Sequence, residues 1–476
     1  MPHYLDYVNW LFLFYFVGLH GVYLMLTVSS MLYLPKFLRE HSTEDLTPLH
    51  ADFEPPVTII VPAYNEAATI ASSIRALMQL EYPEYEIIVI NDGSTDNTLD
   101  VLINEFSLQP FPEVYRIQIE TKPVSAIYRS TTFSNIRIID KTNGGKADSI
   151  NTGINASYFP LYCCVDADSV LERNSLKKVV RPFIEDPETV ASGGVVRILN
   201  GCTVKDGYIE KVGLSKNILA LFQVVEYLRA FMFGRLGWTP MNALLIISGA
   251  FGVFRKETVI AAGGYRTNCI GEDMELVVRL HRTLIEQRKP YKIHFVPDPV
   301  CWTEAPEKIS VLRKQRVRWQ IGLAESLTTN ISLLFNRKGG AVSWLAFPFF
   351  LVFECFGPFL EVSGFIIVAY AFYIGLVPNE FFLIFMMLAV GLGMLVSVTS
   401  LVLEEVSFRT SNNAWELLLL FVIAIIENLG YRQLNAIWRV SGMVDWLTKK
   451  EHSWGDMERQ ASWNKANSAD KKSAQP

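Results

Sequence analysis

The sequence lacks the basic excess that proteins binding nucleic acid usually carry. Its 476 residues include 43 Lys and Arg against 48 Asp and Glu, for a net charge of −5, so we expect no nucleic-acid partner. The six cysteines lie scattered with no metal-ligand spacing, which favours reduced thiols in the cytosol over a disulfide framework. Charged residues are few, at 19%, whereas 50% of the residues are hydrophobic. The chain is therefore too apolar, and also too long, to be a single ordinary soluble domain.

The apolar residues gather in two regions, 8–34 and 341–438, and leave 55–300 with the composition of a soluble domain. The first region is long enough to cross a bilayer. A secretory signal peptide is the alternative, but it needs basic residues before its apolar core. Here no Lys or Arg precedes the run, while Lys36 and Arg39 follow it. We therefore predict an uncleaved N-terminal transmembrane helix with its N-terminus outside.

The second apolar region is predicted to cross the membrane four times. Basic residues collect after Tyr431, which indicates a cytoplasmic C-terminus and hence an even number of crossings. Gly357-Pro358 separates the first two segments, because proline breaks a helix. We expect five crossings in all, with three and a re-entrant segment as the alternative, in a multi-pass protein of the plasma membrane whose residues 55–300 are cytoplasmic. The four segments are Ala341–Phe356, Phe359–Tyr373, Phe381–Leu403 and Trp415–Tyr431.

Residues 55–300 alternate between strand and helix patterns. Four short apolar, β-branched runs are predicted to be buried strands, each followed by polar residues and a helix. This alternation predicts an α/β domain with a parallel sheet and helices on both faces. Ligands of such sheets bind beyond the carboxyl ends of the strands. The strands are Val57–Val61, Ile87–Ile90, Ile136–Ile139 and Leu161–Val165.

The polar clusters after these strands predict a binding site at one edge of the sheet. Asp166 and Asp168 can hold a hard divalent cation through oxygen, and such an ion would bridge a diphosphate and stabilise a leaving group. A polar turn is the alternative, because aspartate is common in turns. The clusters are Tyr64-Asn65-Glu66, Asp92–Asp96, Asn143–Lys146 and Asp166-Ala167-Asp168.

Asp92 and Lys146 are candidate ligands of a nucleotide. Asp92 can accept a hydrogen bond from the imide N–H of a uracil, while its turn leads into a helix from Asn97 with Asp96 as N-cap. Asn143-Gly144-Gly145-Lys146 precedes a helix, where backbone N–H groups and a lysine favour phosphate.

An acidic pair, Glu272-Asp273, opens the helical stretch Met274–Arg288. A favourable interaction with the dipole of the helix is enough to explain an acidic residue at position Glu272. A hydroxyl acceptor, however, needs a base to take its proton. Asp273 is the candidate for that base.

Three residues, Gln315, Arg318 and Trp319, share one helix face because they are spaced i, i+3, i+4. Arginine can pair with phosphate oxygens in forked geometry, and an indole offers a flat surface to a sugar ring. An interfacial helix held by membrane headgroups is the alternative, since neighbouring residues are basic. The largely apolar run Ile218–Trp238 is predicted to be another interfacial or groove-lining helix.

Together these motifs resemble those of the processive, membrane-embedded family 2 glycosyltransferases, which include hyaluronan, chitin, cellulose and poly-N-acetylglucosamine synthases. The resemblance covers roughly residues 55–325, and the motifs occur in the same order. The matching stretches are Val61-Pro62-Ala63-Tyr64-Asn65-Glu66, Asn91–Asp96, Gly144-Gly145-Lys146-Ala147, Asp166-Ala167-Asp168, Glu272-Asp273 and Gln315-x-x-Arg318-Trp319.

The resemblance implies a GT-A fold, a UDP-sugar donor, Mg²⁺ or Mn²⁺, and inversion at the anomeric carbon. It implies that Asp273 is the catalytic base and that Asp166 and Asp168 hold the metal. The acceptor sugar and the diphosphate would be bound by Gln315, Arg318 and Trp319. The donor would be bound by Tyr64, Glu66, Asp92, Lys146 and Asp166, with Tyr64 and Asp92 on the uracil.

Two further stretches resemble the family less closely. Ser248-Gly249-Ala250 is similar to its acceptor-site strand, and Ser453–Arg459 is similar to the gating loop of hyaluronan synthases. Asp456 stands where that loop has threonine. The chain also departs from hyaluronan synthases in having one predicted N-terminal membrane helix instead of two.

The leading hypothesis is a synthase that lengthens a β-linked polysaccharide and passes it outward through its own helices. One alternative is a non-processive transferase that adds a single sugar to a lipid, and another is a transporter or receptor with a nucleotide-sensing domain. The expected partners are the donor, a growing glycan or lipid acceptor, and membrane lipids; the sugar, the linkage and any accessory subunit stay open. The predicted parts are a transmembrane helix (8–34), a catalytic domain (55–300), an interfacial region (301–340), transmembrane helices (341–438) and a cytoplasmic tail (439–476).

Overall fold

The computed structural model describes residues 2–42, 54–205, 207–408 and 413–449. These residues form two compact units, an α/β unit and a helical unit. The α/β unit is discontinuous, because Lys216–Leu245 belongs to the helical unit and Ile246–Ala305 returns to the α/β unit. The predicted catalytic domain therefore includes a helical segment that the structure assigns elsewhere. None of the six cysteines, all of which lie in the described residues, forms a disulfide.

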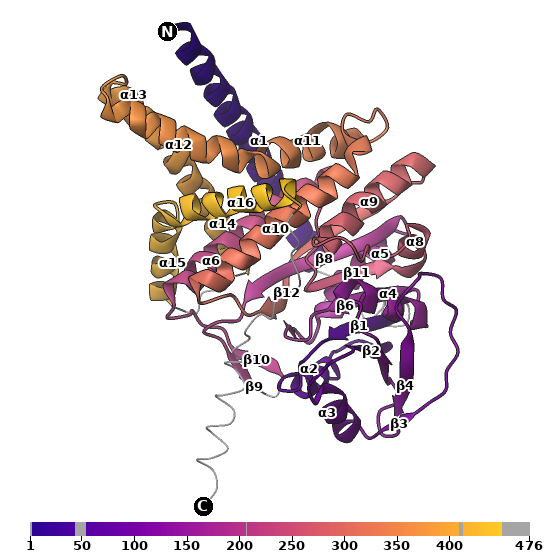
Figure 1. Ribbon diagram of the computed structural model, residues 1–476. Helices are drawn as coiled ribbons and strands as arrows, with labels where there is room; N and C mark the ends of the chain where they lie inside the picture. The colour runs from indigo at the N-terminus through magenta and orange to yellow at the C-terminus, as the bar shows by residue number, and fades with distance from the viewer. Residues whose placement is uncertain (1, 43–53, 206, 409–412, 450–476) are drawn as a thin grey trace, which may run out of the picture. The chain divides into compact units, whose positions relative to one another are not determined.

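The α/β unit is built on a ten-stranded sheet in the order β3-β4-β5-β2-β1-β6-β11-β8-β12-β7. Its centre is parallel and contains the four predicted strands, each of them extended or unchanged in the structure (Figure 1). These strands are β1 (Val57–Ala63), β2 (Tyr85–Asp92), β5 (Ile136–Lys141) and β6 (Leu161–Val165).

β1 continues through Pro62, where the sequence predicts that it stops. Pro62 lies opposite Ile90 of β2, but the pairing of β1 with β6 has already ended at Ile60. A proline lacks the N–H that a central strand needs, so it is tolerated where one neighbour is missing.

The four predicted strands pair in parallel, but the whole sheet is mixed because further strands join it. β11 (Phe251–Arg255) runs antiparallel to both of its neighbours, and β4 (Val124–Ser130) runs antiparallel to β5. The mixed order arises because β11 re-enters the sheet after the chain has left it for the helical unit. The remaining strands are β3 (Leu108–Pro110), β7 (Val170–Leu171), β8 (Thr189–Ile198) and β12 (Lys292–Thr303), with a separate hairpin of β9 (Thr203–Lys205) and β10 (Tyr208–Lys211).

Helix α4 (Lys146–Ala156) packs closely on β1 and β2, and its residues from Ala147 onward are buried. Gly153 allows this approach, because a Cβ at that position would lie 2.5 Å from Cγ2 of Ile60. The packing fixes the N-terminus of α4, and with it Lys146, at the carboxyl edge of the sheet. The other helices of this unit are α2 (Ile70–Leu77), α3 (Thr98–Glu105), α5 (Ser175–Glu185), α8 (Lys256–Ala261) and α9 (Glu272–Gln287).

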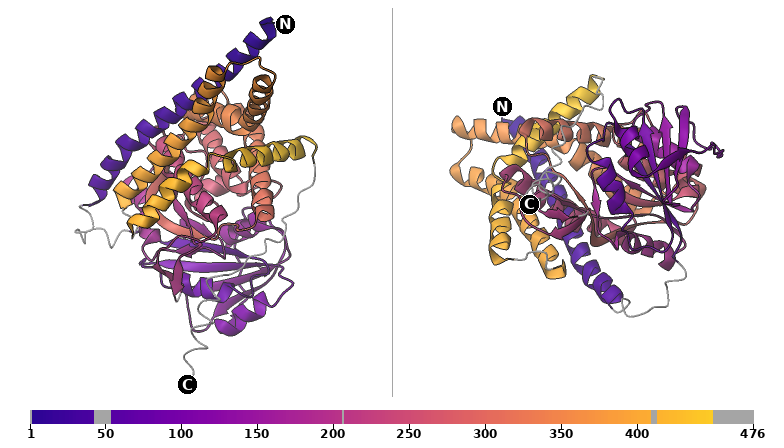
Figure 2. Two further views of the ribbon diagram at one scale, coloured as in Figure 1. Left: turned by 90° about the vertical axis from the view of Figure 1, so that its left-hand side faces the viewer. Right: turned by 90° about the horizontal axis from the view of Figure 1, so that it is seen from below.

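The helical unit begins with one long helix, α1 (Pro2–Ser42), which lies beside later helices of the same unit (Figure 2). It packs against α7 (Leu236–Trp238), where the missing side chain of Gly237 leaves room for Leu26. The Gly237 carbonyl oxygen also accepts a hydrogen bond from the Ser29 hydroxyl at 2.8 Å. The predicted helix Ile218–Trp238 is confirmed as α6 (Ile218–Leu228), a π-helical segment (Arg229–Arg235) and α7. The other helices are α10 (Ile309–Thr329), α11 (Phe347–Phe349), α12 (Gly357–Tyr373), α13 (Asn379–Met386), α14 (Leu392–Phe408), α15 (Ala414–Ile426) and α16 (Tyr431–Leu447).

Two helices among the described residues are long and apolar enough to cross a membrane, Phe14–Arg39 and Phe382–Phe408. Two bent pairs raise the number to four if each pair is one span: Val342–Cys355 with Gly357–Tyr373, and Ala414–Ile426 with Tyr431–Leu447. These helices are those of a membrane protein. The predicted five crossings exceed this range by one, because Val342–Cys355 and Gly357–Tyr373 count as one bent pair with a 43° angle at the predicted break.

Candidate active site

The loops after β1 and β2 are tied together by Asn65, a member of the predicted Tyr64-Asn65-Glu66 cluster for which no separate role is predicted. Asn65 adopts a left-handed conformation with φ of 55°, and its Oδ1 accepts the Thr95 N–H at 2.8 Å. In return, Asp96 Oδ2 accepts the Ala67 N–H at 3.2 Å. The predicted N-cap is one residue off: Asn97 is the N-cap of α3, and Asp96 precedes it, with its Oδ1 accepting the Thr98 N–H at 2.9 Å.

This loop pair carries two of the predicted donor-binding residues. Tyr64 is 44% exposed at the end of β1, so its ring is open to a ligand. Glu66 is half-buried, and its Oε2 accepts the Thr69 hydroxyl at 2.8 Å. Glu66 therefore orders the turn into α2 as well as facing the loop.

Asp92 is buried at the end of β2 with its carboxylate engaged by three donors. Oδ1 accepts the Lys141 ammonium at 2.7 Å and the Gly144 N–H at 2.9 Å, and Oδ2 accepts the Gly145 N–H at 2.8 Å. Asp92 thus holds the glycine loop in front of α4. Gly145 needs to be glycine here because its φ is +87°.

Lys146 opens α4, and its Nζ is surrounded by acceptors. It lies 2.5 Å from Asp166 Oδ1, 3.2 Å from the Gly249 carbonyl oxygen and 3.8 Å from Glu272 Oε1. Burial alone would lower the pKa of Lys146, but Asp166 and Glu272 outweigh burial and hold that pKa well above its usual range. Lys146 is therefore a fixed positive charge between the two acidic motifs.

Asp273 stands in the first turn of α9 with both carboxylate oxygens oriented by the backbone. Oδ2 accepts the Gly249 N–H at 3.0 Å, and Oδ1 accepts the Met274 N–H at 2.8 Å. Ser248-Gly249-Ala250 is a turn before β11 and not the strand that the sequence predicts. The turn is needed because Gly249 contacts both Asp273 and Lys146 through its backbone.

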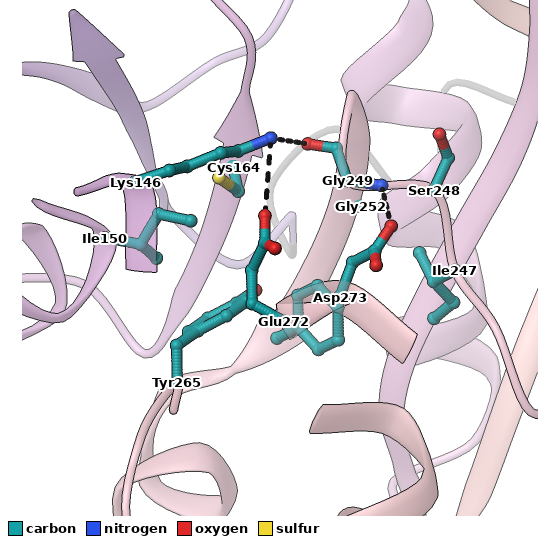
Figure 3. A pocket seen from close by; sticks show the side chains of 11 residues that line it. Lys146, Ile150, Cys164, Ile247, Ser248, Gly249, Gly252, Tyr265, Glu272 and Asp273 are labelled. Atoms are coloured by element: carbon teal, nitrogen blue, oxygen red, sulfur yellow. Dashed lines mark hydrogen bonds and ion pairs between the residues drawn. The ribbon is translucent and has the colours of Figure 1, made fainter. Parts of the chain in front are cut away.

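Lys146, Glu272 and Asp273 line one pocket together with Ser248, Gly249 and Tyr265 (Figure 3). Burial raises the pKa of Glu272 to about 7 against the opposing charge of Lys146. Cys164 also lines the pocket, but burial raises the pKa of its thiol to about 12. A thiol that stays protonated at neutral pH is a poor nucleophile, and Asp273 stays the predicted base.

Asp166 and Asp168 lie in the turn after β6, whose Ala167 carbonyl accepts the Ser73 hydroxyl at 2.5 Å. Burial, followed by the charge of Asp166, raises the pKa of Asp168 to about 7. A divalent cation would remove this repulsion, and two carboxylates offer the oxygen ligands that it prefers. Among the described residues no third acidic, His or Cys side chain joins them, so the other ligands would come from a substrate or water. The two residues fit a partly open metal site.

The predicted acceptor residues lie on α10 in the helical unit. Gln315 and Arg318 are half-buried, and Trp319 is 45% exposed. Their approach to the pocket of the α/β unit stays a prediction. The predicted gating loop, Ser453–Arg459, lies outside the described residues.

Two models of glycosyltransferase families match parts of this chain. The family model described as glycosyl transferase family 2 matches residues 58–257, and that described as glycosyl transferase family group 2 matches 163–398. A mannosyltransferase from Pyrobaculum calidifontis, solved in complex with GDP-Man and Mn²⁺, superposes with a TM-score of 0.51 at 17% identity, covering 92% of this chain and 99% of that one. This similarity shows the fold, which is an α/β GT-A domain with a helical membrane region.

Two curated relatives are poly-beta-1,6-N-acetyl-D-glucosamine synthases. The one from Staphylococcus epidermidis is 28% identical over 320 residues, covering 65% of this chain and 66% of the relative. The one from Staphylococcus aureus (strain COL) is 28% identical over 283 residues, covering 59% and 58%. The chain thus spans slightly less than two thirds of either relative. The family models that match the chain are those of glycosyltransferases. The chain contains a glycosyl transferase family 2 domain, matched over residues 58–257.

Proposed function

We propose that this chain is a processive, inverting synthase that builds a β-linked polysaccharide from a UDP-sugar and exports it through its own membrane helices. The observation that carries the proposal is the pocket lined by Asp273 and Lys146, where the Lys146 ammonium also pairs with Asp166 of the predicted metal pair. The names of the two staphylococcal relatives favour β-1,6-linked N-acetylglucosamine as the product. The matching activated donor is UDP-N-acetylglucosamine.

The donor is proposed to bind along the carboxyl edge of the sheet. Tyr64 stacks on the uracil, and Asp92 fixes the glycine loop that faces it. Glu66 supports the same loop pair. A divalent cation, Mg²⁺ or Mn²⁺, held by Asp166 and Asp168, would neutralise the diphosphate as it leaves. Lys146, now paired with Asp166, would turn toward the phosphate oxygens once the cation takes that carboxylate.

The transfer step uses Asp273 as the base. The acceptor hydroxyl gives its proton to the Asp273 carboxylate while its oxygen forms the new bond to the anomeric carbon. The bond from that carbon to the β-phosphate oxygen breaks, and UDP leaves with the electron pair. Attack opposite to the leaving group inverts the anomeric configuration. The two backbone N–H groups on Asp273 hold it in one orientation for this step.

The acceptor end is proposed to rest on α10. The Trp319 indole provides a stacking surface for the terminal sugar, and Gln315 and Arg318 hydrogen-bond the sugar and the diphosphate. A growing glycan that stays on this platform between transfers would be lengthened without release. An acceptor lipid carrying one added sugar is the other outcome that product size would reveal.

The decisive experiment supplies full-length protein in lipid nanodiscs with labelled UDP-sugars and sizes the products. We expect Mg²⁺- or Mn²⁺-dependent formation of long chains from UDP-N-acetylglucosamine, which a β-1,6-specific glycosidase degrades. A single added sugar on lipid would replace the synthase with the simpler transferase. No hydrolysis or transfer from any donor would contradict the enzymatic assignment itself.

A further inference from the structure

Glu226 on α6 binds residues from two other helices of the same unit. Its Oε2 accepts the Arg316 guanidinium at 2.8 Å and the Tyr431 hydroxyl at 2.8 Å. Its Oε1 accepts the Asn435 amide at 3.3 Å. Arg316 belongs to α10, and the other two donors belong to α16. One carboxylate therefore joins three helices that are distant in sequence.

Arg316 transmits this constraint to Trp319. The Arg316 side chain is only 3% exposed, and its guanidinium carbon lies 4.3 Å from the centroid of the Trp319 ring. The two residues are one helical turn apart, so the guanidinium covers one face of the indole. Trp319 as a whole is nevertheless 45% exposed. The indole is thus supported by a buried cation while much of its surface remains open.

We propose that Glu226 is a positioning residue for Trp319, acting through Arg316 to hold the indole ready for the terminal sugar of the acceptor. The inference rests on the proposed acceptor role of Trp319 and adds the group that orients it. The Trp319 side chain has two rotatable torsions, and an indole free to turn would present its flat surface to the sugar only part of the time. A guanidinium fixed by a charged hydrogen bond removes that freedom.

A second ion pair in the same unit provides a matched control. Arg439 of α16 donates from Nη2 to Glu354 Oε2 at 2.9 Å and from Nε to Gln320 Oε1 at 2.8 Å. The ion pair joins α16 to the π-helical segment Phe350–Cys355, the bond to Gln320 joins α16 to α10, and the side chains of Arg439 and Glu354 are both half-buried. It engages Gln320 rather than Arg316. Removing its charge should perturb the packing of the helices without releasing the support of Trp319.

The test compares Glu226→Gln, Arg316→Lys and Glu354→Gln in full-length protein in nanodiscs with the accepted UDP-sugar. Both oxygens of Glu226 accept hydrogen bonds, so the amide introduced by Glu226→Gln would place a donor against a donor. In Arg316→Lys the charge remains but the planar stacking group is lost. Both variants should shorten the polymer and lower the transfer rate about tenfold, as expected for a loss of positioning. Donor KM and hydrolysis of donor by water should stay within about twofold.

Glu354→Gln should lower thermal stability by an amount similar to Glu226→Gln yet keep normal product length. Equal shortening by Glu354→Gln, or normal polymer from both Glu226→Gln and Arg316→Lys, would overturn the inference. Trp319→Ala distinguishes a failure of the proposed acceptor role of Trp319 from a failure of the positioning role of Glu226. If Trp319→Ala makes normal polymer, the proposed acceptor role fails; if it shortens the polymer while the other two variants do not, only the positioning role of Glu226 fails.

Discussion

Asp273 has its two carboxylate oxygens held by two different backbone N–H groups, one of which belongs to the Ser248-Gly249-Ala250 turn. The same turn holds Lys146 through the Gly249 carbonyl. The base and the positive charge of the pocket are therefore set by one short segment. A substitution at Gly249 would disturb both at once, since a Cβ there would lie 3.1 Å from Asp273 Oδ2 and 3.4 Å from Lys146 Nζ.

Asp273→Asn should abolish transfer while leaving the donor bound. The amide keeps the shape of the carboxylate but cannot take a proton, so the transfer rate should fall by about a hundredfold or more. The UDP affinity, measured by calorimetry, should be unchanged. Asp186→Asn, which removes a surface acid paired with Lys292, is the control and should transfer normally. Transfer at the normal rate by Asp273→Asn would assign the base elsewhere.

Asp168→Asn should weaken metal binding and transfer together. The substitution removes one oxygen ligand and the charge that a cation would neutralise, and loss of one such electrostatic partner costs about a hundredfold or more in rate. Calorimetric titration of Mn²⁺ in the presence of UDP should show the weakened binding directly. Full activity of the unaltered protein in excess chelator would contradict the metal assignment.

Glu272 should make the protein less stable as the pH rises. Burial raises the pKa of Glu272 from 4.5 to about 7, so the folded state holds a proton that the unfolded state has lost. Its contribution is therefore full below pH 4.5 and is lost as the pH passes 7. The charges facing it, from Lys146, Asp273 and Asp166, are the same in Glu272→Gln. The melting temperature of full-length protein in chelator should fall between pH 5 and pH 8, and it should fall less in Glu272→Gln than in the unaltered protein. An equal fall in both proteins would show that Glu272 does not titrate in this range.

Among the helices and strands, those whose bounds depend on a short local pattern are predicted best from the sequence. β6 has the predicted bounds because five apolar residues lie between Pro160 and the acidic turn at Asp166. The partner of Asp92 could not be predicted, because Lys141 is brought to it only by the pairing of β2 with β5. Pairing between strands depends on the whole sheet, and neither residue carries a local signal of it.

The excursion of Lys216–Leu245 into the helical unit shows the same limit. Its apolar helix is visible in the sequence, but the unit to which it belongs depends on contacts such as that of Gly237 with Leu26. The site residues were identified by type and spacing at the ends of strands. The role of Asn65 in joining two loops could not be predicted, because it arises from a left-handed backbone conformation. Asparagine tolerates that conformation better than most residues.

The Trp319→Ala variant in helix α10 should separate the binding and hydrolysis of the donor from elongation of the polymer. The indole is assigned to the acceptor sugar, so UDP affinity and hydrolysis of donor by water should change by less than about twofold. Polymer yield and length should fall much further, because the terminal sugar loses its stacking surface. Trp344→Phe, at a residue of the same unit that is 51% exposed, is the control for loss of an indole. Full-length polymer at the normal rate from Trp319→Ala would leave α10 with a structural role only.

For the whole molecule, the packing of α16 bears on how often the chain crosses the membrane. Gly442 of α16 lies against Val317 and Gln320 of α10, and Arg439 donates to Gln320. α10 begins only six residues after β12 ends at Thr303, and so short a link cannot cross a bilayer. We therefore expect α10 and α16 to lie on one side of the membrane, with an even number of crossings between them.

Labelling of single cysteines in intact cells can test this topology. An even number places the loop before α13 on the cytoplasmic side and the loop before α15 outside, whether Val342–Tyr373 crosses twice or re-enters. Leu376→Cys should thus be protected from a membrane-impermeant maleimide, and Ala414→Cys should react; both positions are exposed. The unaltered chain, whose six thiols are buried or half-buried, is the background control. The opposite pattern would mean that the bent pair Val342–Cys355 and Gly357–Tyr373 is one span, and it would place α16 across the membrane from the catalytic unit.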